Sequence, residues 1–295
     1  MIEVLLKLLP LFILIVIGAV LKKIKLLSEY NANLITKFVF YITLPATVFL
    51  SVSKVSINEE LIVLPLSSAV ILILTYFASK YILDKINFEK DKKKVILSST
   101  IMLNLGFLGI PIFNAIYGDI GVAYLSLFDI SCGIIIYTLG NYIVSKKRGF
   151  GSAKNILLSP PFWAVIIGIF ASSNDLSLPI EVNLILGYLA SLTTPLIMIA
   201  MGAFITFKIE NKKEVLTATI LRVFLGLILG IVISYILGLE GLIRNVIIIA
   251  SMFPSAVMTF IFASKEGLDK KLAIEIITVS TIVAMILLLF LINIM

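Results

Sequence analysis

The segment from Asn104 to Pro111 combines an amide side chain, two glycines and a proline within one apolar stretch. An asparagine amide can donate two hydrogen bonds to a carboxylate without carrying a charge. Proline removes a backbone donor and clashes with the preceding turn, so we predict a helix break between Gly109 and Pro111. A half-helix that begins at such a break carries a partial positive charge at its start. Asn104, Gly106, Gly109 and Pro111 are therefore candidates for recognising an anion.

The alternative for this segment is purely structural. Gly106 and Gly109 would then only let helices pack closely, and Pro111 would make a kink, since both residue types are frequent in membrane helices. A second segment with similar features contains Pro254, Ser255 and Thr259. For these three residues, a role in binding and a role in packing are equally supported.

Two ionisable residues lie deep within apolar stretches, where a charge costs about 2.5 to 3.5 kcal/mol or more unless it is paired or hydrated. Asp129 lies about eight residues into its stretch, at roughly 12 Å depth by helical rise, and Arg222 is comparably deep. The two could neutralise one another or bind substrate or a cation, and Asp129 could carry a proton. A structural clamp on backbone carbonyls is an equal alternative for Arg222. Lys37, Lys80 and Glu275 lie near the ends of their stretches, from which long side chains reach the interface.

The composition of the chain predicts which kind of secondary structure holds these residues. Of 295 residues, 60% are hydrophobic and 14% are charged, and the mean hydropathy is +1.16. Soluble domains are about 45 to 50% apolar and about 25% charged, so we predict an all-α integral membrane protein without a soluble domain. Apolar runs of a length suited to crossing a bilayer occur near residues 4–21, 34–53, 61–83, 95–117, 121–144, 156–172, 184–207, 215–237, 243–264 and 272–294.

The absence of certain residue types excludes several kinds of catalytic, metal-binding and disulfide site. Histidine is absent and Cys132 is the only cysteine, which excludes a Ser-His-Asp triad, histidine-ligated metalloprotease motifs and a disulfide framework. Asp129 has no second deep acid with which to form a catalytic pair. We therefore expect no enzyme, no catalytic residues and no metal site, and we interpret Cys132 as a packing residue.

The distribution of basic residues predicts the orientation. The connections after the first, third, fifth, seventh and ninth spans hold 18 Lys and Arg residues, against three on the other side. Because short cytoplasmic loops are enriched in Lys and Arg, both termini are predicted to be non-cytoplasmic. The net charge of +7 then reflects membrane topology rather than nucleic-acid binding.

The two halves of the chain share a pattern at an offset of 150 residues. Pro10 and Gly18 correspond to Pro160 and Gly168, and the Thr-Leu-Pro that ends at Pro45 corresponds to Thr-Thr-Pro in the seventh span. Five spans in each half make the second half enter the membrane from the opposite side. We thus predict two inverted five-helix repeats, residues 1–148 and 149–295, an arrangement common in carriers.

These residues resemble the auxin efflux carrier family, whose plant members are the PIN transporters and whose microbial members include malonate and malate permeases. The resemblance covers the membrane core. It rests on Asn104 to Gly118, Pro254 to Ala263, Leu44-Pro45-Ala46, Tyr137-Thr138-Leu139, Met201 to Phe204 and Leu221-Arg222.

The resemblance implies an elevator-type carrier, usually a homodimer, with a scaffold of spans one, two, six and seven and a transport domain formed by the others. It also implies that broken helices four and nine cross at the midplane, as in bile-acid symporters and NhaA-like antiporters, and that Asn104 contacts a substrate carboxylate. Thr259 stands where plant members have a proline, and Ser255 where they have a glutamine. Substrate identity therefore does not transfer.

The leading hypothesis is a secondary transporter that moves a small organic anion across the cell membrane without a bound cofactor; a coupling proton or sodium ion stays open. The alternatives are a sodium-coupled symporter of the bile-acid type and a non-transporting membrane sensor. A channel is less favoured because no ring of carbonyls or acids is evident. The expected partners are the substrate anion, the lipid bilayer and a second copy of the chain, with no nucleic acid.

Overall fold

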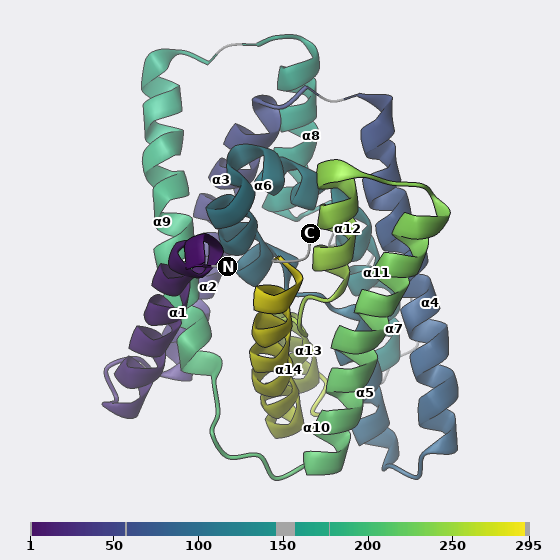
Figure 1. Ribbon diagram of the computed structural model, residues 1–295. Coiled ribbons are helices and arrows are strands. Elements are labelled where there is room, and N and C mark those ends of the chain that lie inside the picture. Colours follow the sequence, from purple (N-terminus) through teal and green to yellow (C-terminus); the bar gives the residue numbers. More distant parts are fainter. Residues whose placement is uncertain (1, 57, 146–156, 177, 293–295) are drawn as a thin grey trace. The chain divides into compact units, whose positions relative to one another are not determined.

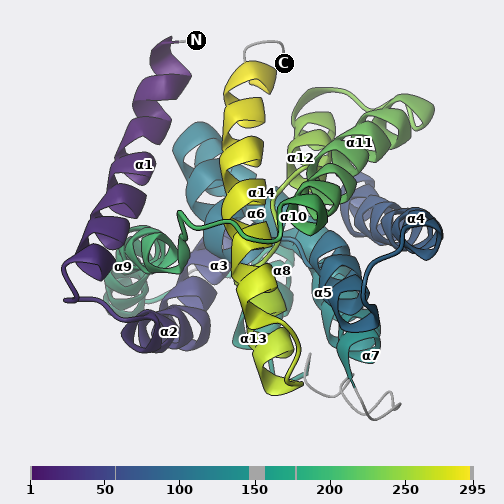
Figure 2. The same ribbon diagram turned by 90° about the horizontal axis from the view of Figure 1, so that it is seen from below.

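The computed structural model describes residues 2–56, 58–145, 157–176 and 178–292 (Figures 1 and 2). These residues form helices, turns and loops, together with a single pair of residues in a β-bridge. The all-helical fold agrees with the prediction from composition. The predicted boundary between the two halves, at residues 148 and 149, lies outside the described residues.

The chain divides into two compact units. Unit 1 comprises Met1–Val63, Gly106–Leu127 and Leu157–Phe204, and unit 2 comprises Leu64–Leu105, Phe128–Ile156 and Ile205–Met295. Helix α6 contributes residues to both units.

Unit 1 is built mainly from the helices of the predicted first, second, sixth and seventh spans. Its elements are α1 (Ile2–Lys23), α2 (Glu29–Phe38), the π-helical turn η1 (Val39–Thr43), α3 (Leu44–Ser53), the 3₁₀ turn η2 (Glu59–Ile62), most of the π-helical turn η3 (Leu105–Gly109), the first part of α6 (Ile110–Ile135), α8 (Pro160–Ser173) and α9 (Ile180–Phe204).

Small residues let the helices of unit 1 approach closely. A methyl group at Gly18 of α1 would collide with the carbonyl oxygen of Ile199 in α9, and one at Gly202 of α9 would collide with the carbonyl oxygen of Ile15. Gly168 has the same function where α8 packs against α3. Membrane helices commonly associate through such small residues, because lipid gives no hydrophobic drive for helix pairing.

Unit 2 is built mainly from the remaining spans, without residues 106–127. Its elements are α4 (Val63–Lys85), α5 (Lys90–Ile101), the end of α6, the π-helical turn η4 (Ile136–Gly140), α7 (Asn141–Val144), α10 (Lys212–Thr219), the π-helical turn η6 (Ile220–Phe224), α11 (Leu225–Ile236), α12 (Gly241–Ser251), α13 (Val257–Lys265) and α14 (Lys270–Leu291). Buried apolar residues of α5, α10 and α14 form one core of this unit, which includes Val95, Ile96, Val215, Ala218, Leu272 and Ile276.

Seven helical segments of the described chain are long and apolar enough to cross a membrane, judged by length and composition. This number is lower than the ten that were expected. The predicted fourth and ninth spans are interrupted, and α8 in the predicted sixth span has only 14 residues. The segment Leu105–Val144 counts as one but contains a sharp kink at Gly118 within α6. This residue has φ 64° and ψ −153°, a non-helical conformation that glycine adopts without steric cost. The chain is thus a multi-pass membrane protein, and ten crossings stay a prediction.

Features separated by 150 residues take matching places within their units. Gly18 packs α1 against α9, and Gly168 packs α8 against α3. In unit 2, α5 ends at Ile101 and α12 ends at Ser251. These correspondences are those that the predicted inverted repeat would produce, and the repeat itself stays a prediction.

Candidate functional site

Two unwound segments of unit 2 pair with one another where α5 and α12 end. Leu103 and Ser255 form an antiparallel β-bridge. The backbone N–H of Asn104 donates to the carbonyl of Pro254 at 3.0 Å, and that of Ala256 donates to the carbonyl of Met102 at 2.8 Å. Non-helical backbone at membrane depth must find partners inside the protein. The pairing supplies them and holds Asn104, which is 2% exposed, beside the second segment.

The first break lies earlier in the chain than predicted. Helix α5 ends at Ile101, its C-cap Met102 has an extended backbone with ψ 96°, and Asn104 lies in the unwound segment. The prediction of a break between Gly109 and Pro111 was wrong, because Gly109 closes the π-helical turn η3 and Pro111 lies in the first turn of α6. Proline is well tolerated in a first helical turn, where its missing N–H has no partner to lose. Gly106 lies within η3, and a methyl group there would be 3.5 Å from a Leu44 side-chain carbon, an ordinary contact.

Arg222 connects the ends of both interrupted helices. It is fully buried in η6, and its two terminal nitrogens donate to the carbonyl oxygens of Thr100 and Ser251. These carbonyls belong to the last turns of α5 and α12, where no intrahelical donor is available. Gly226, one turn after Arg222, provides the space, since a methyl group there would collide with both Ser251 and the guanidinium. These contacts are the carbonyl clamp that we considered for Arg222.

Buried hydroxyl groups of the second unwound segment, the first turn of α13 and α14 form a hydrogen-bonded chain. The Oγ of Ser255 lies 3.0 Å from Oγ1 of Thr259, and both residues are fully buried. The backbone N–H of Ser255 donates to Oγ of Ser280 in α14 at 3.2 Å. The Thr259 hydroxyl also donates to the sulfur of Met102 at 3.6 Å, so it reaches the first unwound segment. The structure therefore brings Asn104, Pro254, Ser255 and Thr259 together within unit 2.

Asp129 has a different environment. It is half-buried on α6, and no hydrogen bond or ion pair joins it to another residue that the structure describes. Asp129 and Arg222 thus do not neutralise one another by direct contact. One turn after Asp129, the sulfur of Cys132 is 3.1 Å from Oγ of Ser68 in α4.

Sequence reasoning missed the partners of these residues. Thr100, Ser251 and Ser280 had no role assigned, although each is a small polar residue inside an apolar stretch. Such residues often form interhelical hydrogen bonds in membranes, and this signal could have identified them.

The expectation for Glu275 was wrong. Its side chain is fully buried and accepts hydrogen bonds from the backbone N–H groups of Glu210 and Asn211, at 3.2 and 3.0 Å. It therefore anchors the connection before α10 instead of reaching the interface. In the same connection, hydrogen bonds from Lys271 and Lys208 lower the pKa of Glu210 to about 2. Glu210 is consequently ionised at neutral pH.

Comparisons with known proteins match the chain to membrane transporters. The family described as membrane transport protein matches residues 3–155 and 149–292. The chain is 27% identical over 285 residues to an uncharacterized transporter of Methanothermobacter thermautotrophicus, covering 94% of each chain. It is 30% identical over 285 residues to the uncharacterized transporter MJ1031 of Methanocaldococcus jannaschii, covering 91% of each. It is also 23% identical over 275 residues to the uncharacterized transporter YfdV of Escherichia coli K12, covering 88% of this chain and 87% of that protein.

Proposed function

Because the chain belongs to the membrane transport protein family, we propose that it is a secondary carrier for a small organic anion, specifically a carboxylate. The family match confirms the resemblance to the auxin efflux carriers, and the transport class follows from it. The pairing of the two unwound segments in unit 2 carries the finer proposal, because carriers bind their substrates where interrupted helices meet.

The charges around the paired segments favour an anion. A helix C-terminus carries about half a negative charge and an N-terminus about half a positive charge. Arg222 places one positive charge on the C-terminal carbonyls of both α5 and α12, which roughly cancels their combined field. Helix α13 begins directly after the second unwound segment and has no acidic residue in its first turn. Its positive end therefore remains available to an anion.

In this proposal Asn104 is the residue that recognises the carboxylate. Its backbone is fixed by the hydrogen bond to Pro254, so its amide is held in the unwound segment rather than on a regular helix. Neutral donors bind an anion without placing another full charge in the membrane. They give moderate affinity, which suits a carrier that must also release its substrate.

The elevator mechanism and the homodimer are further parts of the proposal, taken from the family resemblance. The division of the chain supports the first, since unit 1 holds the helices expected for a scaffold and unit 2 holds both unwound segments. Residues 106–127 group with unit 1, although the resemblance places them in the transport domain. In an elevator, unit 2 would carry the anion while unit 1 stays fixed.

Uptake into proteoliposomes tests the carrier proposal. The purified chain should take up a radiolabelled dicarboxylate or monocarboxylate with saturable kinetics, after a thermal-shift screen has identified a stabilising carboxylate. A ligand at 100 times its dissociation constant stabilises by about 2.7 kcal/mol, which such a screen detects. Specific binding without any flux would instead identify a sensor, and ion conductance without saturation would identify a channel.

Substitution of Asn104 tests where the carboxylate sits. Losing a hydrogen bond to a charged group costs about 1.5 to 3 kcal/mol, so Asn104→Ala should weaken binding roughly 10- to 150-fold. Asn104→Asp should weaken it further, because it opposes one carboxylate with another. Asn174→Ala, at the exposed end of α8 in unit 1, is the matched control and should bind normally. Wild-type affinity in Asn104→Ala would remove the paired segments from the substrate site.

A further inference from the structure

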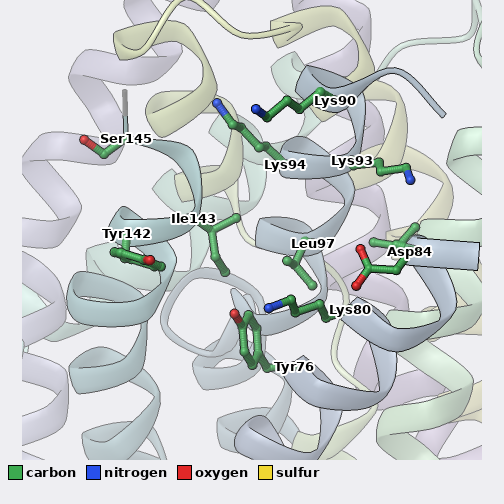
Figure 3. A pocket seen from close by; sticks show the side chains of 11 residues that line it. Tyr76, Lys80, Asp84, Lys90, Lys93, Lys94, Leu97, Tyr142, Ile143 and Ser145 are labelled. Carbon is green, nitrogen blue, oxygen red and sulfur yellow. The ribbon is translucent and has the colours of Figure 1, made fainter. Parts of the chain in front are cut away.

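Unit 2 also contains a cavity whose lining includes several lysines. It is a pocket of about 520 Å³ between α4, α5 and the chain around α7. Figure 3 shows the side chains around it. Its lining is Tyr76, Lys80, Leu83, Asp84, Lys90, Lys93, Lys94, Leu97, Tyr142, Ile143 and Ser145. None of the residues assigned above to the carboxylate site lines it.

The rim of this pocket carries excess positive charge. Four lysines line it, against the single acid Asp84. Lys80, Lys90 and Lys93 form no ion pair with another residue in the described ranges, and Lys94 contacts only Asp91, at 3.5 Å. Lysines in excess of the acids around one cavity attract an anion, and ammonium groups are effective donors to phosphate oxygens.

The interior of the pocket is apolar on one side. Leu83 and Ile143 are buried, and Leu97 and Tyr76 are half-buried, so aliphatic and aromatic carbon lies behind the lysines. A cavity with a basic rim and an apolar wall suits a molecule that has both an anionic group and a hydrocarbon part. A small hydrophilic anion would leave the apolar wall unused.

The adjoining surface of α4 indicates the source of such a molecule. Phe77 and Tyr81 are 62% and 63% exposed, on an outward face that continues through other apolar residues of α4. At the end of this face, Nζ of Lys85 lies 2.6 Å from the Tyr81 hydroxyl and 4.1 Å from the ring centroid. Aromatic residues with nearby lysines mark the level of the lipid headgroups in membrane helices. The pocket lies beside Tyr76 and Lys80 in the same last turns of α4, hence at headgroup level.

We infer that this pocket binds the phosphate headgroup of an anionic phospholipid. The lysines of α4 and α5 hold the phosphate, and the acyl chains lie along the apolar face of α4. Basic pockets between membrane helices bind anionic headgroups through this chemistry. With the predicted orientation, the lipid comes from the cytoplasmic leaflet.

Thermal melting of the purified full chain with added lipid tests the inference. Phosphatidylglycerol should raise the melting temperature above that with phosphatidylcholine. In the pocket variant Lys90→Gln/Lys93→Gln/Lys94→Gln, the apparent affinity for phosphatidylglycerol should fall on the order of 10- to 100-fold. The control Lys23→Gln/Lys25→Gln/Lys213→Gln removes the same charge from exposed positions outside the pocket and should keep the wild-type response.

Two further arms identify the ligand and guard against misfolding. Glycerol phosphate and inorganic phosphate carry the same anionic group without acyl chains, and neither should stabilise the protein at lipid concentrations. The single variant Lys93→Gln, measured by lipid retention in native mass spectrometry, should retain less phosphatidylglycerol even if the triple variant does not fold. Equal stabilisation by glycerol phosphate, an unchanged response in Lys93→Gln, or an equal loss in the control would each overturn the inference.

Discussion

Arg222 is the largest fully buried side chain among the described residues, and its position shows how a membrane protein tolerates a charge. The guanidinium is planar and always protonated, and its fork of donors reaches two carbonyls at once. The carbonyls of Thr100 and Ser251 lie at helix ends that would otherwise have no donor. Asp129, in contrast, has no such partner in the described part of the chain. Arg222 therefore connects two helix ends, and a role of Asp129 in transport stays a prediction.

Replacement of Arg222 should destabilise unit 2. Arg222→Met keeps the apolar stem but loses two charge-assisted hydrogen bonds, each worth about 1.5 to 3 kcal/mol. We expect a large fall in the melting temperature in detergent, and a smaller fall for Arg222→Lys, whose ammonium cannot span both carbonyls. Arg244→Met, at a half-buried arginine of α12, serves as the control. If Arg222→Met melts like wild type, the clamp does not hold the two broken helices.

Asp129 is predicted to carry the coupling charge, a proton or a sodium ion. Asp129→Asn removes the charge with little change in volume, so gradient-driven accumulation should fall to the level of passive exchange while the melting temperature is kept. Asp119→Asn is a matched control on the same helix, because Asp119 is engaged by Lys54 at 2.9 Å and by Ser51 at 3.1 Å. Uptake should be measured with separate proton and sodium gradients. Full accumulation by Asp129→Asn would assign the residue a structural role only.

At the scale of elements, interruptions and close approaches decide how the helices are placed. Four π-helical turns, η1, η3, η4 and η6, occur in the described helices, and such turns are frequent at functional sites. One of them contains Arg222, and another follows Asn104 directly. The π-helical turns interrupt regular helices. The glycines of α1 and α9, in contrast, let two regular helices pack backbone to backbone.

This packing predicts opposite outcomes for two glycine substitutions in α9. In Gly202→Ala the new methyl group would meet the backbone of α1, which cannot shift cheaply, so we expect a loss of about 1 to 3 kcal/mol, typical of overpacking. At Gly187 nothing lies within 4 Å of the added methyl, and alanine has the higher helix propensity. Gly187→Ala should therefore melt at or slightly above the wild-type temperature. The idea fails if both variants behave alike in a detergent melting experiment.

At the scale of the whole molecule, the chain is a multi-pass membrane protein whose two units each contain segments distant in sequence. In the predicted ten-span topology, positive charge is concentrated on alternate connections. The same asymmetry places the basic pocket and the Glu275 anchor on the side predicted to be cytoplasmic.

The orientation can be tested with single cysteines in a Cys132→Ala background. Lys265→Cys and Asn174→Cys place thiols at exposed positions on opposite predicted sides. An impermeant maleimide should label Asn174→Cys in intact cells and Lys265→Cys only after permeabilisation. The reverse labelling, or labelling of both from one side, would contradict the ten-span topology.

Several features could be predicted from residues alone. The membrane class follows from composition, because hydropathy is a local property of each segment. The interruption near Asn104 could also be expected, although its position was displaced by several residues. Proline and glycine indicate where a helix can break, but Pro111 fits the first turn of α6 equally well. Whether Pro111 breaks a helix or begins one depends on how the surrounding helices pack in the folded chain.

Sequence by itself indicated which polar groups lie within apolar stretches, and tertiary structure decided what each of them contacts. Arg222 binds a carbonyl 122 residues away, and the bridge partners Leu103 and Ser255 come from different halves of the chain. No periodicity encodes such pairs, because they depend on how distant helices pack. The cost of an unsatisfied group in lipid ensures that a partner exists, and the packing of the helices selects which one it is.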